Sequence, residues 1–134
     1  MSLIRDLHHV SLIVADTARA LAFYRDLLGL ELVTRPPLGF PGAWLRIGDR
    51  QIHLLELPPI LPGPDPVTGR PDHGGRDRHL ALSLVALDPL VVALDQAGIP
   101  YTLSRSGRRA LFCRDPDGNA LEFVEVHETA SGGS

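Results

Sequence analysis

Two stretches of the chain decide the fold: LHHVSLIVAD at residues 7–16 and RHLALSLVAL at residues 78–87. In each stretch, large apolar residues alternate with other residues, and this alternation is typical of a β-strand with one buried face. A histidine stands at the start of both strands, and a helical pattern follows each of them. The repetition predicts that the chain is built from two similar modules.

The first module reads as strand, helix and three further strands. Asp16 is expected to cap a helix over residues 17–28, and Gly29 occupies the position where a glycine ends a helix. The helix has an apolar face made of Ala20, Phe23, Tyr24, Leu27 and Leu28. The strands of this module are predicted at residues 8–14, 30–34, 43–47 and 51–57, with a turn at Gly48-Asp49 between the last two.

The second module repeats this order. Asp88-Pro89 is expected to provide the cap and first residue of a helix over 89–97, which Gly98 ends. The sequence DPDGN at 115–119 predicts a turn before the last strand. The strands of this module are predicted at residues 79–85, 100–103, 109–114 and 119–127.

Residues 58–78 separate the modules and hold six prolines and four glycines, so we expect them to form a linker without helix or strand. We therefore predict an α+β fold of two βαβββ modules. One domain is expected over residues 1–128, comprising module 1–57, linker 58–78 and module 79–128, followed by a flexible tail at 129–134.

Composition excludes several classes of function. All thirteen basic residues are arginine, which excludes lysine Schiff-base chemistry and a phosphate-binding loop lysine. The net charge of −3 and the scattered arginines do not match a nucleic-acid binder. No apolar run approaches the ~20 residues that span a bilayer, and no secretory signal is recognisable. We therefore expect a cytoplasmic protein that binds neither membrane nor nucleic acid.

Four residues stand out as candidate metal ligands. His9 and His79 lie on the non-apolar faces of the first strands, and His53 and Glu122 lie at matching points of the last strands. A twofold relation between the modules would bring all four together. Three imidazoles and a carboxylate suit Zn, Ni, Fe, Co or Mn. Without His53, the remaining three residues also form a metal-binding set with open coordination positions.

Other polar residues are better explained without metal. Glu56 and Glu125 face the other side of their strands and are expected to be solvated or to cap helices. His8 faces away from His9 and is assigned a structural role, whereas His73 is expected to be a solvated linker residue. Cys113 lies in a predicted strand and is expected to be a buried, inert thiol.

The quoted motifs resemble the vicinal oxygen chelate superfamily, which includes glyoxalases, bleomycin resistance proteins and dioxygenases. The resemblance rests on residues 7–16, on FYRDLLGL at 23–30, on RHLALS at 78–83 and on DPDGNALE at 115–122. It implies a cupped mixed sheet built from two βαβββ modules, usually assembled as a homodimer. It also implies one divalent metal ion held by His9, His53, His79 and Glu122.

The resemblance implies a lyase or isomerase in which the metal polarises adjacent oxygens of a small metabolite and stabilises an oxyanion or enediolate-like intermediate. Glu122 or His53 would then move a proton. Glyoxalase I enzymes usually carry a carboxylate where His53 stands. The alternatives are an Fe(II) extradiol-type dioxygenase, and a binding protein that sequesters a small molecule, as bleomycin resistance proteins do.

An anionic substrate is suggested by arginines near the predicted site. Arg46 and Arg114 stand at matching places on the third strands and follow Trp44 and Phe112, so these four residues are candidates for substrate binding. The competing interpretation is a solvated surface with salt bridges. Further arginines occur at Arg70, Arg76, Arg78, Arg105, Arg108 and Arg109.

Overall fold

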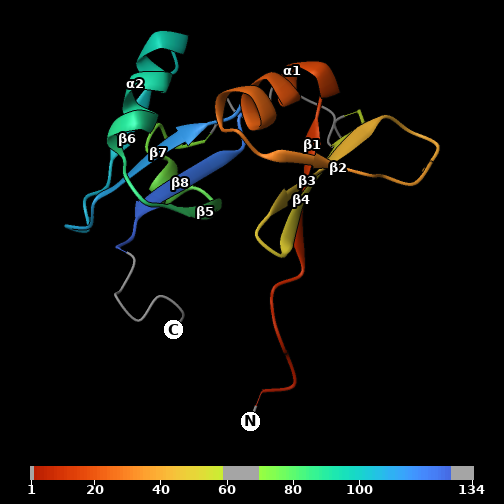
Figure 1. Cartoon of the computed structure of the whole chain (residues 1–134). Coiled ribbons are helices and arrows are strands. Elements are labelled where there is room, and N and C mark those ends of the chain that lie inside the picture. The colour runs from red at the N-terminus through yellow and green to blue at the C-terminus, as the bar shows by residue number, and fades with distance from the viewer. Residues whose placement is uncertain (1, 59–69, 128–134) are drawn as a thin grey trace. The chain divides into compact units, whose positions relative to one another are not determined.

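The computed structural model describes residues 2–58 and 70–127 (Figure 1). The chain divides into two compact units, Met1–Pro62 and Gly63–Ser134. The predicted tail at 129–134 and much of the predicted linker lie outside the described residues. In the described part of the chain, no helix has the length and apolar character needed to cross a membrane.

The first unit contains one four-stranded mixed sheet, in the order β1-β4-β3-β2. The first strand runs parallel to the last, and the other neighbouring pairs are antiparallel. Its elements are β1 (His9–Val14), α1 (Thr17–Leu21), η1 (Ala22–Leu27), β2 (Glu31–Val33), β3 (Gly42–Ile47) and β4 (Arg50–Glu56).

The second unit has the same topology, in the order β5-β8-β7-β6, again with the first strand parallel to the last. The predicted α+β fold of two βαβββ modules is therefore confirmed. Its elements are η2 (Gly74–Arg76), β5 (His79–Leu84), α2 (Asp88–Ala97), β6 (Tyr101–Leu103), β7 (Ala110–Arg114) and β8 (Ala120–Glu125).

In both units, a glutamate at the end of the last strand forms a hydrogen bond with the backbone at the start of the helix. The carboxylate of Glu56, at the end of β4, accepts a hydrogen bond from the backbone N–H of Thr17 (2.7 Å). Glu125, at the end of β8, accepts one from the N–H of Leu87 (2.9 Å). Because the first N–H groups of a helix have no partner within it, both glutamates act as caps from a distance. This result settles their role in favour of capping.

The first helix differs from the prediction of one α-helix over 17–28. Asp16 caps it as expected, with its side chain accepting from the N–H of Arg19 (3.2 Å). After Leu21, however, the chain widens into the π-helix η1, in which the N–H of Leu28 reaches the carbonyl of Phe23 (3.0 Å). Phe23 and Tyr24 lie within this wider turn, and both are buried in the core. Side-chain periodicity alone does not distinguish these helix types.

Two other local predictions were wrong. Asp88 is the first residue of α2 rather than its cap. Leu87 occupies the cap position, and its N–H donates to the carboxylate of Glu125. The described part of the predicted linker includes a short 3-10 helix, Gly74–Arg76, where no helix was expected. A single turn of this kind needs few residues and tolerates glycine.

Each unit buries its own apolar residues between sheet and helix. In the first unit, Val14 of β1, Leu45 of β3 and Leu54 of β4 are at most 1 % exposed. In the second unit, Leu94 of α2 and Leu121 of β8 are fully buried. The opposite faces of β1 and β5 stay exposed at His9 and His79, as the alternation predicts. That exposed face carries the candidate site.

Candidate functional site

In the second unit, β5 and β8 bring His79 and Glu122 together. Glu122 pairs in register with Ala81, two residues beyond His79, and its Oε1 lies 3.2 Å from Nε2 of His79. The carboxylate is only 3 % exposed, whereas His79 is more open. Two ligands bound to one ion at ~2.0–2.2 Å lie about 2.8–3.6 Å apart over the range from octahedral to tetrahedral angles. The pair therefore has the spacing of two ligands of one metal ion.

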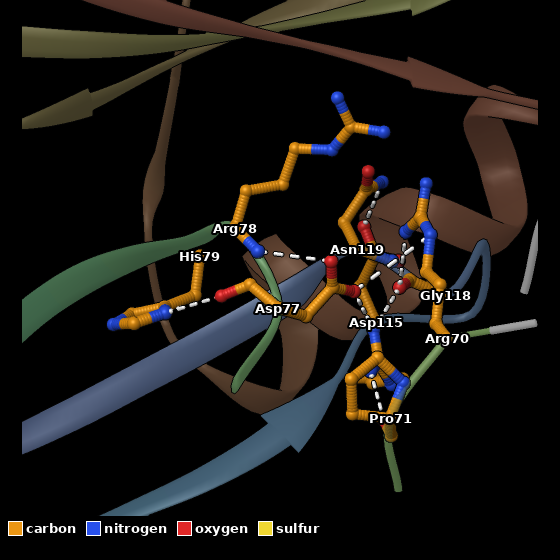
Figure 2. A network of polar contacts seen from close by, with 9 residues as sticks. Arg70, Pro71, Asp77, Arg78, His79, Asp115, Gly118 and Asn119 are labelled. Atoms are coloured by element: carbon orange, nitrogen blue, oxygen red, sulfur yellow. Dashed lines mark hydrogen bonds and ion pairs between the residues drawn. The ribbon is translucent and has the colours of Figure 1, made fainter. Parts of the chain in front are cut away.

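The backbone determines which nitrogen of His79 faces this carboxylate. Its Nδ1 lies 2.8 Å from the carbonyl oxygen of Asp77, which only accepts hydrogen bonds, so Nδ1 carries a proton (Figure 2). In a neutral ring, Nε2 then presents a lone pair to Glu122. Metal-binding histidines are commonly oriented by such a contact to a carbonyl.

Arg108 is a second partner of the same carboxylate. Its Nη2 donates to Oε2 of Glu122 at 3.0 Å, from a side chain that is 60 % exposed. The cation offsets part of the cost of burying the carboxylate charge. The sequence showed Arg108 only as one of several further arginines and gave no sign of this pairing, which depends on the loop between β6 and β7.

Arg114 holds the segment that orients His79. Its Nη1 donates to Oδ2 of Asp77 (2.9 Å) and to the carbonyl of Gly118 (2.8 Å), and its Nη2 donates to the carbonyl of Pro71 (2.7 Å). The hydrogen bond from Arg114 holds the pKa of the Asp77 carboxyl below its ordinary value. Arg114, predicted as a substrate-binding residue, thus makes three contacts within its own unit.

Phe112, also a predicted substrate-binding residue, lies beside Glu122 on the sheet, and its ring stands edge-on to His79 at 5.2 Å between centroids. His73 contacts the same ring at 4.9 Å, and its Nδ1 lies 2.7 Å from the hydroxyl of Thr102. The prediction of a merely solvated His73 was therefore wrong. Its position depends on a long-range contact that the linker sequence does not indicate.

In the first unit, the rings of His9 and His53 stack at 4.1 Å between centroids, with an interplanar angle of 21°. Trp44 stacks on His53, also at 4.1 Å. His53 pairs with Ser11 and Trp44, as Glu122 pairs with Ala81 and Phe112, so the predicted correspondence of positions holds in the register.

The nitrogens of these two histidines have other partners in the structure. Nε2 of His53 lies 2.8 Å from the side-chain oxygen of Gln51, and Nδ1 of His9 lies 2.9 Å from Nδ1 of His8. A single ion cannot lie in the planes of two stacked rings. Joint ligation by His9 and His53 therefore requires one ring to turn. Burial, and then the charges of His9, His8 and Arg35, hold the pKa of His53 below its ordinary value.

Two remaining predictions concern Arg46 and Cys113. Arg46 forms an ion pair with Glu31 on the neighbouring strand β2, and both side chains are half or more exposed. Cys113 is buried as expected, and burial together with the charge of Asp115 raises the pKa of its thiol to about 12. A thiol of that kind is protonated and unreactive at neutral pH.

Within residues 2–58 and 70–127, no three His, Cys, Asp or Glu side chains are gathered closely enough to hold a metal. The donors instead occur as pairs, His9 with His53 and His79 with Glu122. Sequence reasoning missed Gln51 and Arg35 near the first pair. Gln51 shares a strand face with His53, which was a usable signal, whereas Arg35 lies in an irregular segment without one.

The repeated sheet order, with candidate ligands on the first and last strands of each unit, defines a glyoxalase-type protein. The chain belongs to the Glyoxalase/Bleomycin resistance protein/Dioxygenase superfamily, whose family model matches residues 6–123. This result bears out the resemblance read from the motifs.

Three relatives illustrate the range of the family. "Glyoxylase I 4" of Arabidopsis thaliana is 29% identical over 123 residues, covering 87% of this chain and 68% of that protein. "Glutathione transferase FosA" of Serratia marcescens is 29% identical over 126 residues, covering 90% and 81%. The crystal structure of a protein assigned to the glyoxalase family from Bacillus anthracis superposes with a TM-score of 0.74 at 23% identity, covering 93% and 98%, and shares the fold.

Proposed function

We propose that this protein is a metal-dependent enzyme, a lyase or isomerase, that acts on a small oxygenated metabolite. One divalent ion (Ni, Zn, Fe, Co or Mn) would be bound by His9, His53, His79 and Glu122. The observation that carries the proposal is the contact between Nε2 of His79 and Oε1 of Glu122.

When the His79 ring is neutral, no hydrogen atom lies between its Nε2 and Oε1 of Glu122. Because Asp77 accepts the Nδ1 proton, a lone pair on Nε2 faces a carboxylate oxygen at 3.2 Å. Two acceptors at this distance repel each other unless a cation lies between them or beside them. Arg108 already supplies one cation at the other carboxylate oxygen. At the facing atoms themselves, the repulsion is removed either by a proton on His79 or by a divalent ion bound by both. Two of the family relatives are named as enzymes, which supports a catalytic role for this protein.

When bound, a divalent ion supplies Lewis-acid stabilisation to an oxyanion or enediolate-like intermediate. The residues of this chain supply the rest. Glu122, buried and hydrogen-bonded to Arg108, is placed to hold a proton abstracted next to a carbonyl. His53 would be a second proton carrier when it is not fully committed to the metal, because desolvation favours its neutral, proton-accepting form and lowers its pKa.

The proposal includes a homodimer and a cytoplasmic location. Each sheet ends in two edge strands, β1 and β2 in the first unit and β5 and β6 in the second. Open edges favour pairing with another chain or cover by it. Leu103 on β6 is 64% exposed, which is consistent with a surface that needs cover.

Three assays on purified protein loaded with each metal distinguish the reaction classes. Turnover of the adduct formed by a 2-oxoaldehyde and a thiol supports the lyase or isomerase. Oxygen uptake with a catechol would indicate the Fe(II) dioxygenase, and tight binding without product would indicate a sequestering protein. Glu122→Gln keeps the size of the side chain and should abolish turnover. Unchanged turnover in this variant or after chelation would contradict the proposal.

A further inference from the structure

A small pocket in the first unit contains a cation without an anionic partner. The pocket has a volume of about 90 Å³. Arg35 lines it, and no carboxylate among the described residues pairs with this side chain. The other side chains that matter for recognition are Ser11, Phe40, Trp44 and His53.

The guanidinium of Arg35 is held in place on one side. Its Nη2 donates to the carbonyl of Phe40 at 2.8 Å, and its central carbon lies 5.0 Å from the centre of the Phe40 ring. Gly42 makes room for it, since a Cβ there would lie 3.1 Å from Nη2 and would also collide with the carbonyl of Leu54. These contacts orient the group and leave its charge uncompensated.

The Nε–H of Arg35 is the unusual feature. It is buried and has no acceptor among the described residues. Leaving such a donor unsatisfied costs about 1–3 kcal/mol, and more when the group is charged. An anionic oxygen in the pocket, with a small rotation of the side chain, would remove this cost. Nη1 also has no acceptor in the described part of the chain and would add a second hydrogen bond.

The two arginines predicted for substrate binding are already neutralised. Arg46 is paired with Glu31, and Arg114 is paired with Asp77. Either would have to give up a carboxylate before it could bind a substrate anion. Arg35 has no carboxylate partner to release among the described residues, and it lines the same pocket as His53.

We infer that Arg35 is the residue that recognises substrate charge, and that it takes a small anionic oxygen group, such as a carboxylate or a phosphonate, in the pocket beside Trp44 and His53. The inference deepens the proposed function by naming a substrate class. It rests on that function only in identifying the bound anion as part of the substrate. Anion binding itself requires no metal, so it can fail or succeed independently.

Trp44 makes the test direct, because it is the only tryptophan of the chain and it lines the pocket. Metal-free protein is titrated with lactate and with methylphosphonate while tryptophan emission is followed, with lactamide as the neutral analogue of lactate. We expect a saturable change with at least one anion and none with lactamide. Arg35→Met should weaken binding about tenfold or more, which corresponds to ~1.4 kcal/mol.

Arg25→Met is the matched control, because Arg25 lies on η1, is exposed and pairs with Asp26. It should bind the anions as the parent does. Arg35→Lys keeps the charge without the Nε–H and should bind with intermediate affinity. The inference is overturned if the parent shows no saturable change with either anion, if lactamide binds equally well, or if folded Arg35→Met binds like the parent. Should Arg35→Met not fold, Arg35→Lys and the parent's preference for anions decide.

Discussion

His53 and Glu122 occupy equivalent positions in the two units, opposite Trp44 and Phe112 on the neighbouring strands. The two positions differ in charge, because Glu122 carries a carboxylate and His53 does not. With one carboxylate among four protein ligands, a divalent site keeps a net charge of about +1, and a second carboxylate would neutralise it. A net positive site binds anionic oxygen more strongly and lowers the pKa of bound water further.

Substitutions at His53 should therefore affect substrate more than metal. We expect His53→Ala to weaken metal binding modestly, about tenfold, because three ligands remain. His53→Glu should restore metal affinity and shift the pH dependence of turnover. Calorimetric titration with Ni, Zn, Mn and Fe(II), paired with pH–rate profiles, measures both effects. If His53→Ala bound every metal as the parent does and turned over normally, His53 would be structural.

Cys113 offers a simple check of the second unit's packing. Its thiol is buried in β7, and its raised pKa of about 12 means that almost none is ionised at pH 8. We expect Ellman's reagent to leave the native protein unlabelled over minutes and to label one thiol per chain in denaturant. Rapid labelling of native protein at pH 8 would show that the strand is open.

At the scale of elements, Asp77 joins the segment between η2 and β5 to two arginines, with ion pairs to Arg114 at 2.9 Å and to Arg70 at 3.7 Å. Asp77 is held by Arg114, and the hydrogen bond from Arg114 lowers the pKa of the Asp77 carboxyl below the ordinary 3.8. A carboxyl group whose pKa is lower in the folded chain than in the unfolded chain stabilises the folded state at pH values above the pKa of the unfolded chain. This stabilisation is lost as the pH falls through the pKa of the folded chain.

The midpoint of thermal unfolding should therefore fall more steeply for the parent than for Asp77→Asn as the pH is lowered below about 4. Above about pH 5 the difference between the two proteins should be constant, because the carboxyl is fully ionised in both the folded and unfolded parent. Circular dichroism melts at several pH values give the two curves. Parallel curves from pH 3 to 7 would mean that the ion pair contributes nothing to folding.

The order of elements could be predicted because alternation, cap residues and the glycines at 29 and 98 are local signals. The π-helical turn of η1 could not be predicted from the sequence, since Phe23 and Tyr24 follow the same apolar pattern in either helix type. The pairs His9–His53 and His79–Glu122 were inferable from strand facing. Three other contacts could not be inferred, because each depends on the conformation of an irregular segment: those of Arg35, His73 and Arg108.

At the scale of the whole molecule, the assembly is open to a direct test. We expect a homodimer, because each sheet leaves edge strands and exposed apolar side chains such as Leu103. Multi-angle light scattering across a tenfold range of concentrations should give twice the chain mass of 14.5 kDa. A monomer mass at every concentration would remove the dimer from the account.

The central proposal is that the chain binds one divalent ion, with His79 and Glu122 among its ligands. The decisive measurement is the metal content of protein purified without added ions and then titrated with Ni and Zn, for the parent, His79→Ala and Glu122→Ala. The account predicts about one equivalent per chain in the parent and a loss of at least 100-fold in affinity in either variant, because each removes one member of the pair that lies 3.2 Å apart. Equal metal content in all three proteins, or none in the parent after titration, would contradict it.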